Sequence, residues 1–162
     1  MKLDAIDLKI LYYLQINGRI SNIELSQLIG LSPAPTLERV KKLENANIIE
    51  GYKAKLNRER LNLDISVFVN IRLNKQSDNE INSFQKKVSL FPEVVECYKV
   101  TGKSDFLLKI TVKDIASFEK FHSTELSAMS EVNSTETMLI ISEVKNNSLL
   151  PLKYNIHETR PK

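Results

Sequence analysis

A pattern of helix caps near the amino end of the chain constrains its fold more than any other feature. Ser21 followed by Glu24 forms a capping box, so a helix should begin there, and Gly30 can adopt the left-handed conformation that ends it. Ser32 should cap a second helix with Pro33 at its first position, where a missing N–H costs nothing. Two helices joined by a tight glycine turn make a helix-turn-helix, so DNA is the first candidate partner.

The second helix of this motif is predicted to bury one face and expose the other. Thr36, Val40 and Leu43 recur at helical spacing and should face inward. On the exposed side, Arg39 is the first choice for a base or phosphate contact because its guanidinium can hold guanine with two hydrogen bonds, and Lys42 suits a phosphate. The residues predicted to contact DNA are Asn22, Ser32, Pro33, Ala34, Pro35, Glu38, Arg39, Lys41 and Lys42.

A three-helix module that binds protein is the alternative interpretation of this motif. Residues 1–60 hold ten Lys or Arg against seven Asp or Glu, whereas residues 61–162 hold thirteen of each. The whole positive excess therefore lies with the motif, where neutralised phosphates would release condensed counterions, and this favours DNA. Two details stay open. Glu38 fits either a contact to cytosine or an ion pair with a lysine, and Lys41 fits either DNA contact or ordinary solvation.

The chain divides into two regions of different character. A helix over about residues 4–15 should complete a small three-helix core with the motif. The segment 51–56 looks extended and basic, and it fits either a wing or a strand leading out of the domain. Polar residues between 57 and 64 indicate a hinge. We therefore predict a winged helix-turn-helix domain over residues 1–60 and a second domain over residues 61–162.

Beyond the hinge, the spacing of apolar residues changes from helical to alternating. Strands are predicted at about 66–73, 94–100, 106–112 and 132–144, with one helix capped by Asp78 and another by Asp114. The order βαββαβ predicts an α+β, ferredoxin-like domain with its helices on one face of the sheet. Because an uncovered apolar sheet face usually meets another copy of itself, we expect a dimer through this half. Residues 147–152 fit an additional edge strand.

These segments resemble the Lrp/AsnC family of bacterial and archaeal transcription regulators. The resemblance rests on LDAIDLKILYYLQINGRISNIELSQLIGLSP, LERVKKLENANIIEGY, VTGKSDFLLK and ISEVK, in that order. It implies a winged helix-turn-helix, a ferredoxin-like domain that dimerises and binds effectors, and dimers that associate into octamers or open assemblies. It implies no cofactor but an amino acid as effector. An architectural role on DNA without an effector remains the alternative.

The resemblance also implies where the effector binds, between dimers near the loop 101–105. Gly102 permits a positive φ and a close approach of backbone N–H groups to a carboxylate, and Asp105 can accept hydrogen bonds from an α-ammonium group. The alternative is a tight turn in which Asp105 satisfies the turn backbone. Lys99 stands where leucine-responsive members of the family are apolar. The positions implied for the effector are Lys99, Gly102, Asp105, Ile115, Met138, Leu139 and Ile140.

Other function classes find no support in the sequence. The chain has no G-x-S-x-G, H-E-x-x-H, P-loop or dinucleotide motif, so we expect no enzyme and no catalytic residues. Its two histidines lack metal-ligand spacing, and its single cysteine, Cys97, fits a reducing compartment. Without a signal peptide or a membrane-length apolar run, we predict a cytoplasmic protein in a bacterial or archaeal cytosol or nucleoid, with no membrane partner.

Overall fold

The computed structural model describes residues 2–146 and 149–152, which form two compact units. The first unit contains residues up to Lys55 together with the described residues from Lys145 onward, and the second contains Leu56–Val144. The predicted boundary after residue 60 therefore differs from this division. The end of the chain also leaves the second domain, because the Leu150 N–H donates to Gln15 Oε1 at 2.6 Å. Residues 149–152 form no strand, and the rest of the predicted edge strand lies outside the described residues.

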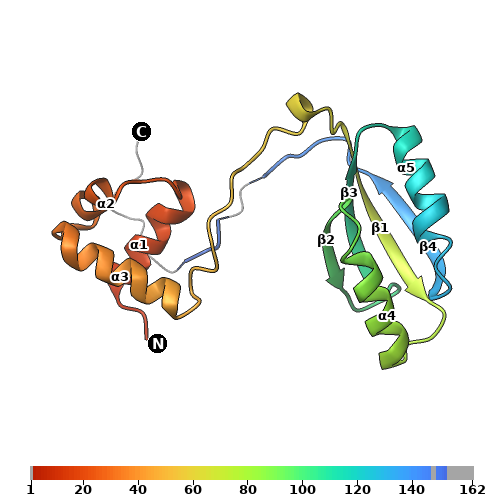
Figure 1. The fold of residues 1–162 in the computed structure, drawn as a ribbon, viewed down its shortest axis with the longest axis horizontal. Helices are drawn as coiled ribbons and strands as arrows, with labels where there is room; N and C mark the ends of the chain where they lie inside the picture. The colour runs from red at the N-terminus through yellow and green to blue at the C-terminus, as the bar shows by residue number, and fades with distance from the viewer. Residues whose placement is uncertain (1, 147–148, 153–162) are drawn as a thin grey trace. The chain divides into compact units, whose positions relative to one another are not determined.

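The first unit is a three-helix core made of α1 (Ala5–Ile16), α2 (Asn22–Ile29) and α3 (Pro33–Asn45), drawn in red to orange in Figure 1. Asp4 caps α1 in a capping box, since Asp7 N–H donates to Asp4 Oδ1 at 2.8 Å and Asp4 N–H donates to Asp7 Oδ2 at 3.1 Å. The buried centre is apolar and consists of Ile10, Leu11, Leu25, Ile29 and Leu43.

The caps of the helix-turn-helix follow the sequence prediction at three positions out of four. Ser21 and Glu24 form the predicted capping box, and Gly30 ends α2 at φ +76°. Ser32 occupies the N-cap of α3, but its side chain makes no capping hydrogen bond, so that part of the prediction is wrong. The reason is local: a cap side chain bonds the N–H of the second or third helical residue, and the third residue is Pro35, which has none.

The basic segment after α3 is extended but forms no strand, within the described residues 50–57. Tyr52 fastens it to the helices, because its hydroxyl donates to Glu44 Oε1 at 3.0 Å. Its ring also lies against Gly18, where an added Cβ would come within 3.2 Å of Tyr52 Cδ1. Burial and the Glu44 carboxylate raise the pKa of Tyr52 to about 12. An extended segment therefore occupies the position of the wing, and the Tyr52 side chain attaches it to α3.

The second unit is a four-stranded antiparallel sheet with two main helices. Its elements are the short 3-10 helix η1 (Glu59–Leu61), β1 (Ile65–Leu73), α4 (Asp78–Val88), β2 (Val94–Lys99), β3 (Phe106–Val112), α5 (Ile115–Phe121), the π-helical turn η2 (His122–Leu126) and β4 (Val132–Leu139). The strand order β2-β3-β1-β4 confirms the ferredoxin-like prediction. Two details differ: β4 ends at Leu139, well before residue 144, and Ser77 rather than Asp78 caps α4. Asp114 caps α5 as predicted.

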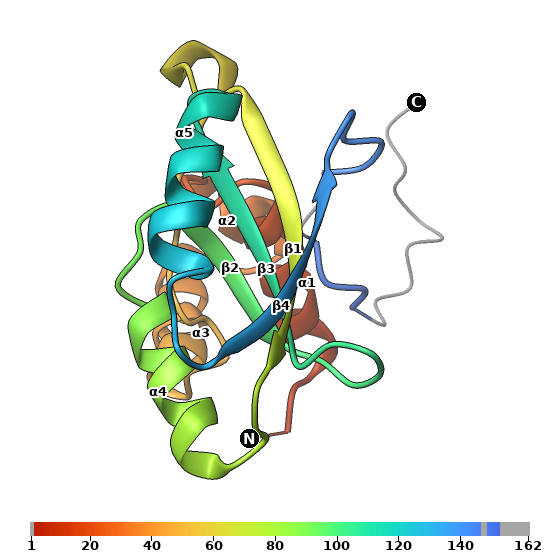
Figure 2. The ribbon, with the colours of Figure 1, turned by 90° about the vertical axis from the view of Figure 1, so that its right-hand side faces the viewer.

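The two faces of the sheet have different environments. Helices α4 and α5 cover one face (Figure 2), where alternate residues such as Val69, Leu108 and Ile110 are completely buried. The opposite side, here called the open face, carries two rows of residues that cross β2, β3, β1 and β4 in that order. One row is Tyr98, Leu107, Asn70 and Glu136, and the other is Glu96, Lys109, Phe68 and Met138.

Candidate nucleic-acid interface and ligand pocket

Helix α3 exposes one stripe of side chains. Ala34, Glu38 and Lys41 recur at i, i+4 and i+7 and are all exposed, with Leu37 and Lys42 exposed beside them. Ser32 and Pro33 at the helix start are exposed as well, whereas Pro35 is half-buried. The predicted DNA-contacting residues are therefore exposed, except for Asn22, Pro35 and Arg39, which are half-buried.

Arg39 is half-buried and forms ion pairs, whereas the sequence placed it on the exposed side of α3; its predicted contact with DNA stays a prediction. Its guanidinium Nη1 lies 2.7 Å from Asp4 Oδ2 and 2.7 Å from Asp7 Oδ1, both on or before α1. One turn separates Arg39 from the buried Thr36 and Leu43, which places it at the edge of the buried stripe and within reach of α1. The Asp7 N–H and the Arg39 guanidinium both lower the pKa of Asp4. Arg39 thus joins α3 to α1.

Asn22 has a similar joining role between α2 and α3. Its side-chain Nδ2 donates to the backbone oxygen of Pro33 at 2.8 Å, so its amide N–H is already used within the motif. The start of α3 offers few donors to a ligand, because Pro33 and Pro35 have no N–H. What remains there is the Ala34 N–H together with the Ser32 hydroxyl, which makes no capping bond.

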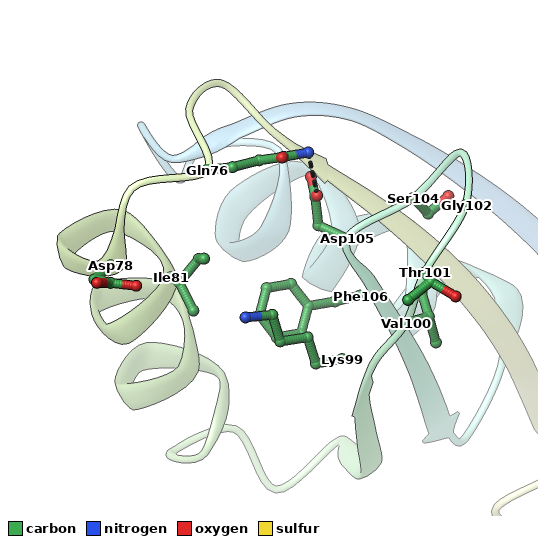
Figure 3. A pocket seen from close by; sticks show the side chains of 10 residues that line it. All are labelled: Gln76, Asp78, Ile81, Lys99, Val100, Thr101, Gly102, Ser104, Asp105 and Phe106. Atoms are coloured by element: carbon green, nitrogen blue, oxygen red, sulfur yellow. Dashed lines mark hydrogen bonds between the residues drawn. The ribbon is translucent and has the colours of Figure 1, made fainter.

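A cavity of about 440 Å³ lies in the second unit beside the loop that joins β2 to β3. We call it the loop cavity (Figure 3). It is bounded by that loop, the end of β2, the start of β3, and the segment that leads into α4. Its lining residues are Gln76, Asp78, Ile81, Lys99, Val100, Thr101, Gly102, Ser104, Asp105 and Phe106.

Asp105 anchors the loop cavity through hydrogen bonds to its surroundings. Its Oδ2 accepts from the Leu73 N–H and its Oδ1 from Gln76 Nε2, each at 2.8 Å, and its own N–H donates to the Ile71 oxygen at 2.8 Å. The Asp105 carboxylate thus bonds the end of β1 and the segment before α4, and not the backbone of its own turn as the alternative predicted. Gly102 adopts φ +114°, as predicted, and nothing lies within 4 Å of an added Cβ there.

Lys99 directs its ammonium group into the loop cavity, beside the Phe106 ring, in Figure 3. It is the one basic side chain in the lining, and no ion pair to it occurs in the part of the chain that the structure describes. Asp78 lies on the α4 side of the cavity in the same view. The cavity thus presents a cation and a carboxylate from different walls.

The remaining predicted effector residues lie at the opposite end of the sheet. Leu139 pairs with Val67 near the start of β1, and Ile115 follows β3, whose last residue pairs with Ile65. The loop cavity, in contrast, adjoins Phe106, which pairs with Ile71 at the other end of β1. Ile115, Met138, Leu139 and Ile140 therefore contribute nothing to the cavity of their own chain. The prediction that they line it together with Asp105 requires residues from a second copy.

Sequence reasoning missed several residues of the cavity wall. Asp78 was predicted as a helix cap, and only the structure shows that Ser77 takes this role and leaves Asp78 at the cavity. Gln76 carried no signal in the sequence, since its contact with Asp105 spans 29 residues. Ile81 and Phe106 were predicted from periodicity alone as residues that face the core.

Neither a metal site nor a membrane-spanning helix occurs in residues 2–146 and 149–152. No group of three or more His, Cys, Asp or Glu side chains there could hold a metal ion. None of the helices formed by these residues is long and apolar enough to cross a membrane.

Family models match both units of this chain. Residues 3–50 match a winged helix-turn-helix DNA-binding model, and residues 66–150 match the Lrp/AsnC ligand binding domain. Together they define a transcription regulator with a DNA-binding and a ligand-binding domain, and not an enzyme. The chain belongs to the Lrp/AsnC family of transcriptional regulators, as its sequence resemblance predicted.

Similar proteins span nearly the whole chain. The leucine-responsive regulatory protein of Haemophilus influenzae is 45% identical over 151 residues, covering 93% of this chain and 91% of that protein. Its counterpart from Rhizobium meliloti is 44% identical over 146 residues, covering 90% and 94%. A transcriptional regulator of Neisseria meningitidis, solved in complex with L-methionine, has a TM-score of 0.90 at 36% identity and covers 94% of this chain and 98% of its own. AsnC of Escherichia coli has a TM-score of 0.84 at 27% identity, covering 92% and 99%.

Proposed function

We propose that this regulator binds double-stranded DNA as a homodimer and that an amino acid bound in the loop cavity changes its affinity for DNA. The observation that carries the proposal is the pairing, in one chain, of an exposed basic helix-turn-helix surface with a cavity that presents Lys99 and Asp78. Because its partner is DNA, we infer that it acts in the cytosol or nucleoid of a bacterium or archaeon.

On DNA, α3 enters the major groove with the stripe of Ala34, Glu38 and Lys41 toward the bases. Lys41 and Lys42 neutralise phosphates, and the Ser32 hydroxyl with the Ala34 N–H holds another phosphate oxygen at the helix start. Arg39 supports this surface indirectly by fixing α3 on α1. A dimer would present two such helices about 34–36 Å apart, or a multiple of that, to a pseudo-palindromic site.

Dimerisation through the open face has chemical support. Phe68 and Leu107 on the two central strands provide apolar area, Tyr98 and Met138 extend it to the edge strands, and α4 and α5 leave that side uncovered. Two of the charges on this face neutralise each other, since Lys109 Nζ lies 3.3 Å from Glu96 Oε1. A face with apolar residues and internally paired charges suits contact with an identical face. Dimers then assemble further into octamers or open assemblies.

An amino acid is the effector class that the loop cavity fits. The N–H groups of residues 101–104 make no hydrogen bond within the described parts of the chain, and they offer donors for a carboxylate. The complex of the Neisseria meningitidis relative with L-methionine supports this ligand class. Ile115, Met138, Leu139 and Ile140 lie far from the cavity within one chain. A second copy of the chain would bring its own set of these residues to the cavity.

The test uses the full chain and a DNA fragment selected by the protein from a genomic library. Its dissociation constant for that fragment is measured by fluorescence anisotropy with and without each L-amino acid at millimolar concentration. At least one amino acid should shift the constant, and DNA should shift the affinity for that amino acid by the same factor. DNA binding that no amino acid changes would contradict the effector proposal and favour the architectural alternative.

A further inference from the structure

We infer that the loop cavity selects an amino acid whose side chain ends in a carboxylate, and that Lys99 is the residue that selects it. This inference rests on the proposed function, because it assumes that the cavity is the effector site. It goes further by assigning the charge of the ligand.

The position of Lys99 is the first step. Lys99 pairs with Phe106 in the β2–β3 ladder, so both side chains lie on the side of the sheet that faces α4. The ammonium group therefore stands inside the cavity rather than on the open face, with Ile81 across from it (Figure 3). Beside the carboxylates of Asp78 and Asp105, Lys99 is the one charged group of the lining that attracts an anion.

The second step is that neither carboxylate of the lining neutralises Lys99. Both oxygens of Asp105 already accept hydrogen bonds, from the Leu73 N–H and from Gln76 Nε2. Asp78 lies on the α4 wall and forms no ion pair with Lys99. An anionic ligand group would supply the partner that Lys99 lacks, through a charge-assisted hydrogen bond.

The third step assigns the rest of the ligand. The N–H groups of residues 101–104 suit the α-carboxylate, which every amino acid has, so they cannot discriminate between side chains. Asp78 is the remaining carboxylate and suits the α-ammonium. Lys99 is then left for the side chain, whose methylenes would lie against Ile81, the partly exposed apolar residue of the α4 wall. An aliphatic side chain would desolvate Lys99 without pairing it, and this penalty disfavours leucine and methionine.

Calorimetric titration of the full-length protein tests the inference with L-glutamate, L-aspartate, L-glutamine, L-leucine, L-methionine and 2-oxoglutarate. One of the two acidic amino acids should bind about tenfold or more tightly than L-glutamine, which has a similar shape but no side-chain charge. Lys99→Met should remove this preference, and Lys99→Arg should keep most of it. Lys86→Met is the matched control, because Lys86 is an exposed lysine of α4 that is not part of the cavity lining, and it should behave as wild type.

The outcomes separate this inference from the proposed function. If L-leucine or L-methionine binds wild type as tightly as the acidic amino acids, or if Lys99→Met keeps their preference, the inference is wrong and the amino-acid effector stands. If 2-oxoglutarate binds as tightly as L-glutamate, the α-ammonium is not recognised and the assignment to an amino acid is overturned. If none of the six compounds binds, the inference fails, and the titration with every L-amino acid decides the effector proposal. Melting curves of each variant check that it is folded.

Discussion

The Arg39 guanidinium lies 2.7 Å from the Asp7 carboxylate and so ties the helix that faces DNA to the first helix of the chain. Asp7 is only 7% exposed, and a buried carboxylate needs a partner to offset its desolvation. The same guanidinium nitrogen also contacts Asp4, the N-cap of α1. Arg39 therefore stabilises the packing of α3 against α1 in the first unit, although it lies on the DNA-binding helix.

Arg39→Ala should act on stability. It leaves the Asp7 carboxylate without its ion pair, so we expect the free energy of unfolding to fall by roughly 1–3 kcal/mol. If Arg39 stays paired with Asp4 and Asp7 on DNA, the slope of log affinity for DNA against log salt concentration should stay as in wild type. Urea unfolding and anisotropy titrations at several salt concentrations measure the two quantities. An unchanged stability with a reduced salt slope would instead support the original prediction of a direct DNA contact.

Lys42→Ala should show the reverse pattern. Lys42 is exposed on α3 and has no ion pair within the described residues, so its loss should leave the melting temperature unchanged. If it contacts a phosphate, the salt slope should fall by about 1, and affinity should weaken similarly on specific and unrelated DNA. Lys120→Ala, which removes a lysine of α5 in the second unit, is the control for a general change in charge. A salt slope equal to that of wild type would place Lys42 away from DNA.

Ser21 and Ser32 form a matched pair of helix caps. Ser21→Ala should destabilise the chain by about 1 kcal/mol, because the hydroxyl accepts the Glu24 N–H. Ser32→Ala should have a much smaller effect on stability, since no capping bond is lost. Its effect should appear in DNA affinity if the hydroxyl holds a phosphate. Thermal unfolding and DNA titration of both variants test this, and equal destabilisation by the two changes would contradict it.

Glu131 should make the second unit sensitive to acid. It is 6% exposed and accepts hydrogen bonds from Lys87 Nζ at 2.6 Å and Ser83 Oγ at 2.6 Å, which hold its pKa at about 2 against an ordinary value of 4.5. Since the folded pKa is the lower one, its stabilisation is present above pH 4.5 and is lost as the pH falls toward 2.

Glu131→Gln measures this contribution directly. The variant should be less stable than wild type at pH 7, and the difference should shrink as the pH falls below 4.5. Urea unfolding followed by circular dichroism between pH 7 and pH 2.5 gives the comparison. Glu119→Gln, an exposed change on α5 away from the open face, should leave the profile as in wild type. A constant difference between Glu131→Gln and wild type at every pH would exclude the proposed linkage.

The sequence predicted what depends on neighbours along the chain. The Ser21–Glu24 capping box, the positive φ of Gly30 and the alternation of β3 are local, and each was confirmed. The pairing of Arg39 with Asp7 spans 32 residues, as does the hydrogen bond from the Leu73 N–H to Asp105. Helical spacing shows that Arg39 lies near the edge of the buried stripe, but only packing decides which helix it meets.

At the candidate ligand site, too, the sequence predicted which residues take part but not the contacts that depend on packing. The sequence resemblance identified Lys99, Gly102 and Asp105, which do meet at the loop cavity. It could not show that Asp105 has both oxygens engaged, nor that Ile115 and Leu139 lie at the other end of the sheet. These facts depend on strand register and on the approach of α4 to the sheet, which no short stretch of sequence specifies.

The open face provides the last prediction. Phe68 lies at its centre, on β1 between Lys109 and Met138, so a charge placed there would be buried in the proposed dimer. Phe68→Arg should convert the dimer to monomer in light scattering at micromolar concentration and weaken DNA binding by about tenfold or more, because two half-sites are no longer bound together. Leu90→Arg is the control: Leu90 is an 80% exposed apolar residue just after α4, outside the open face, and should leave the dimer intact. A Phe68→Arg protein that stays folded and dimeric would show that the copies associate through another surface.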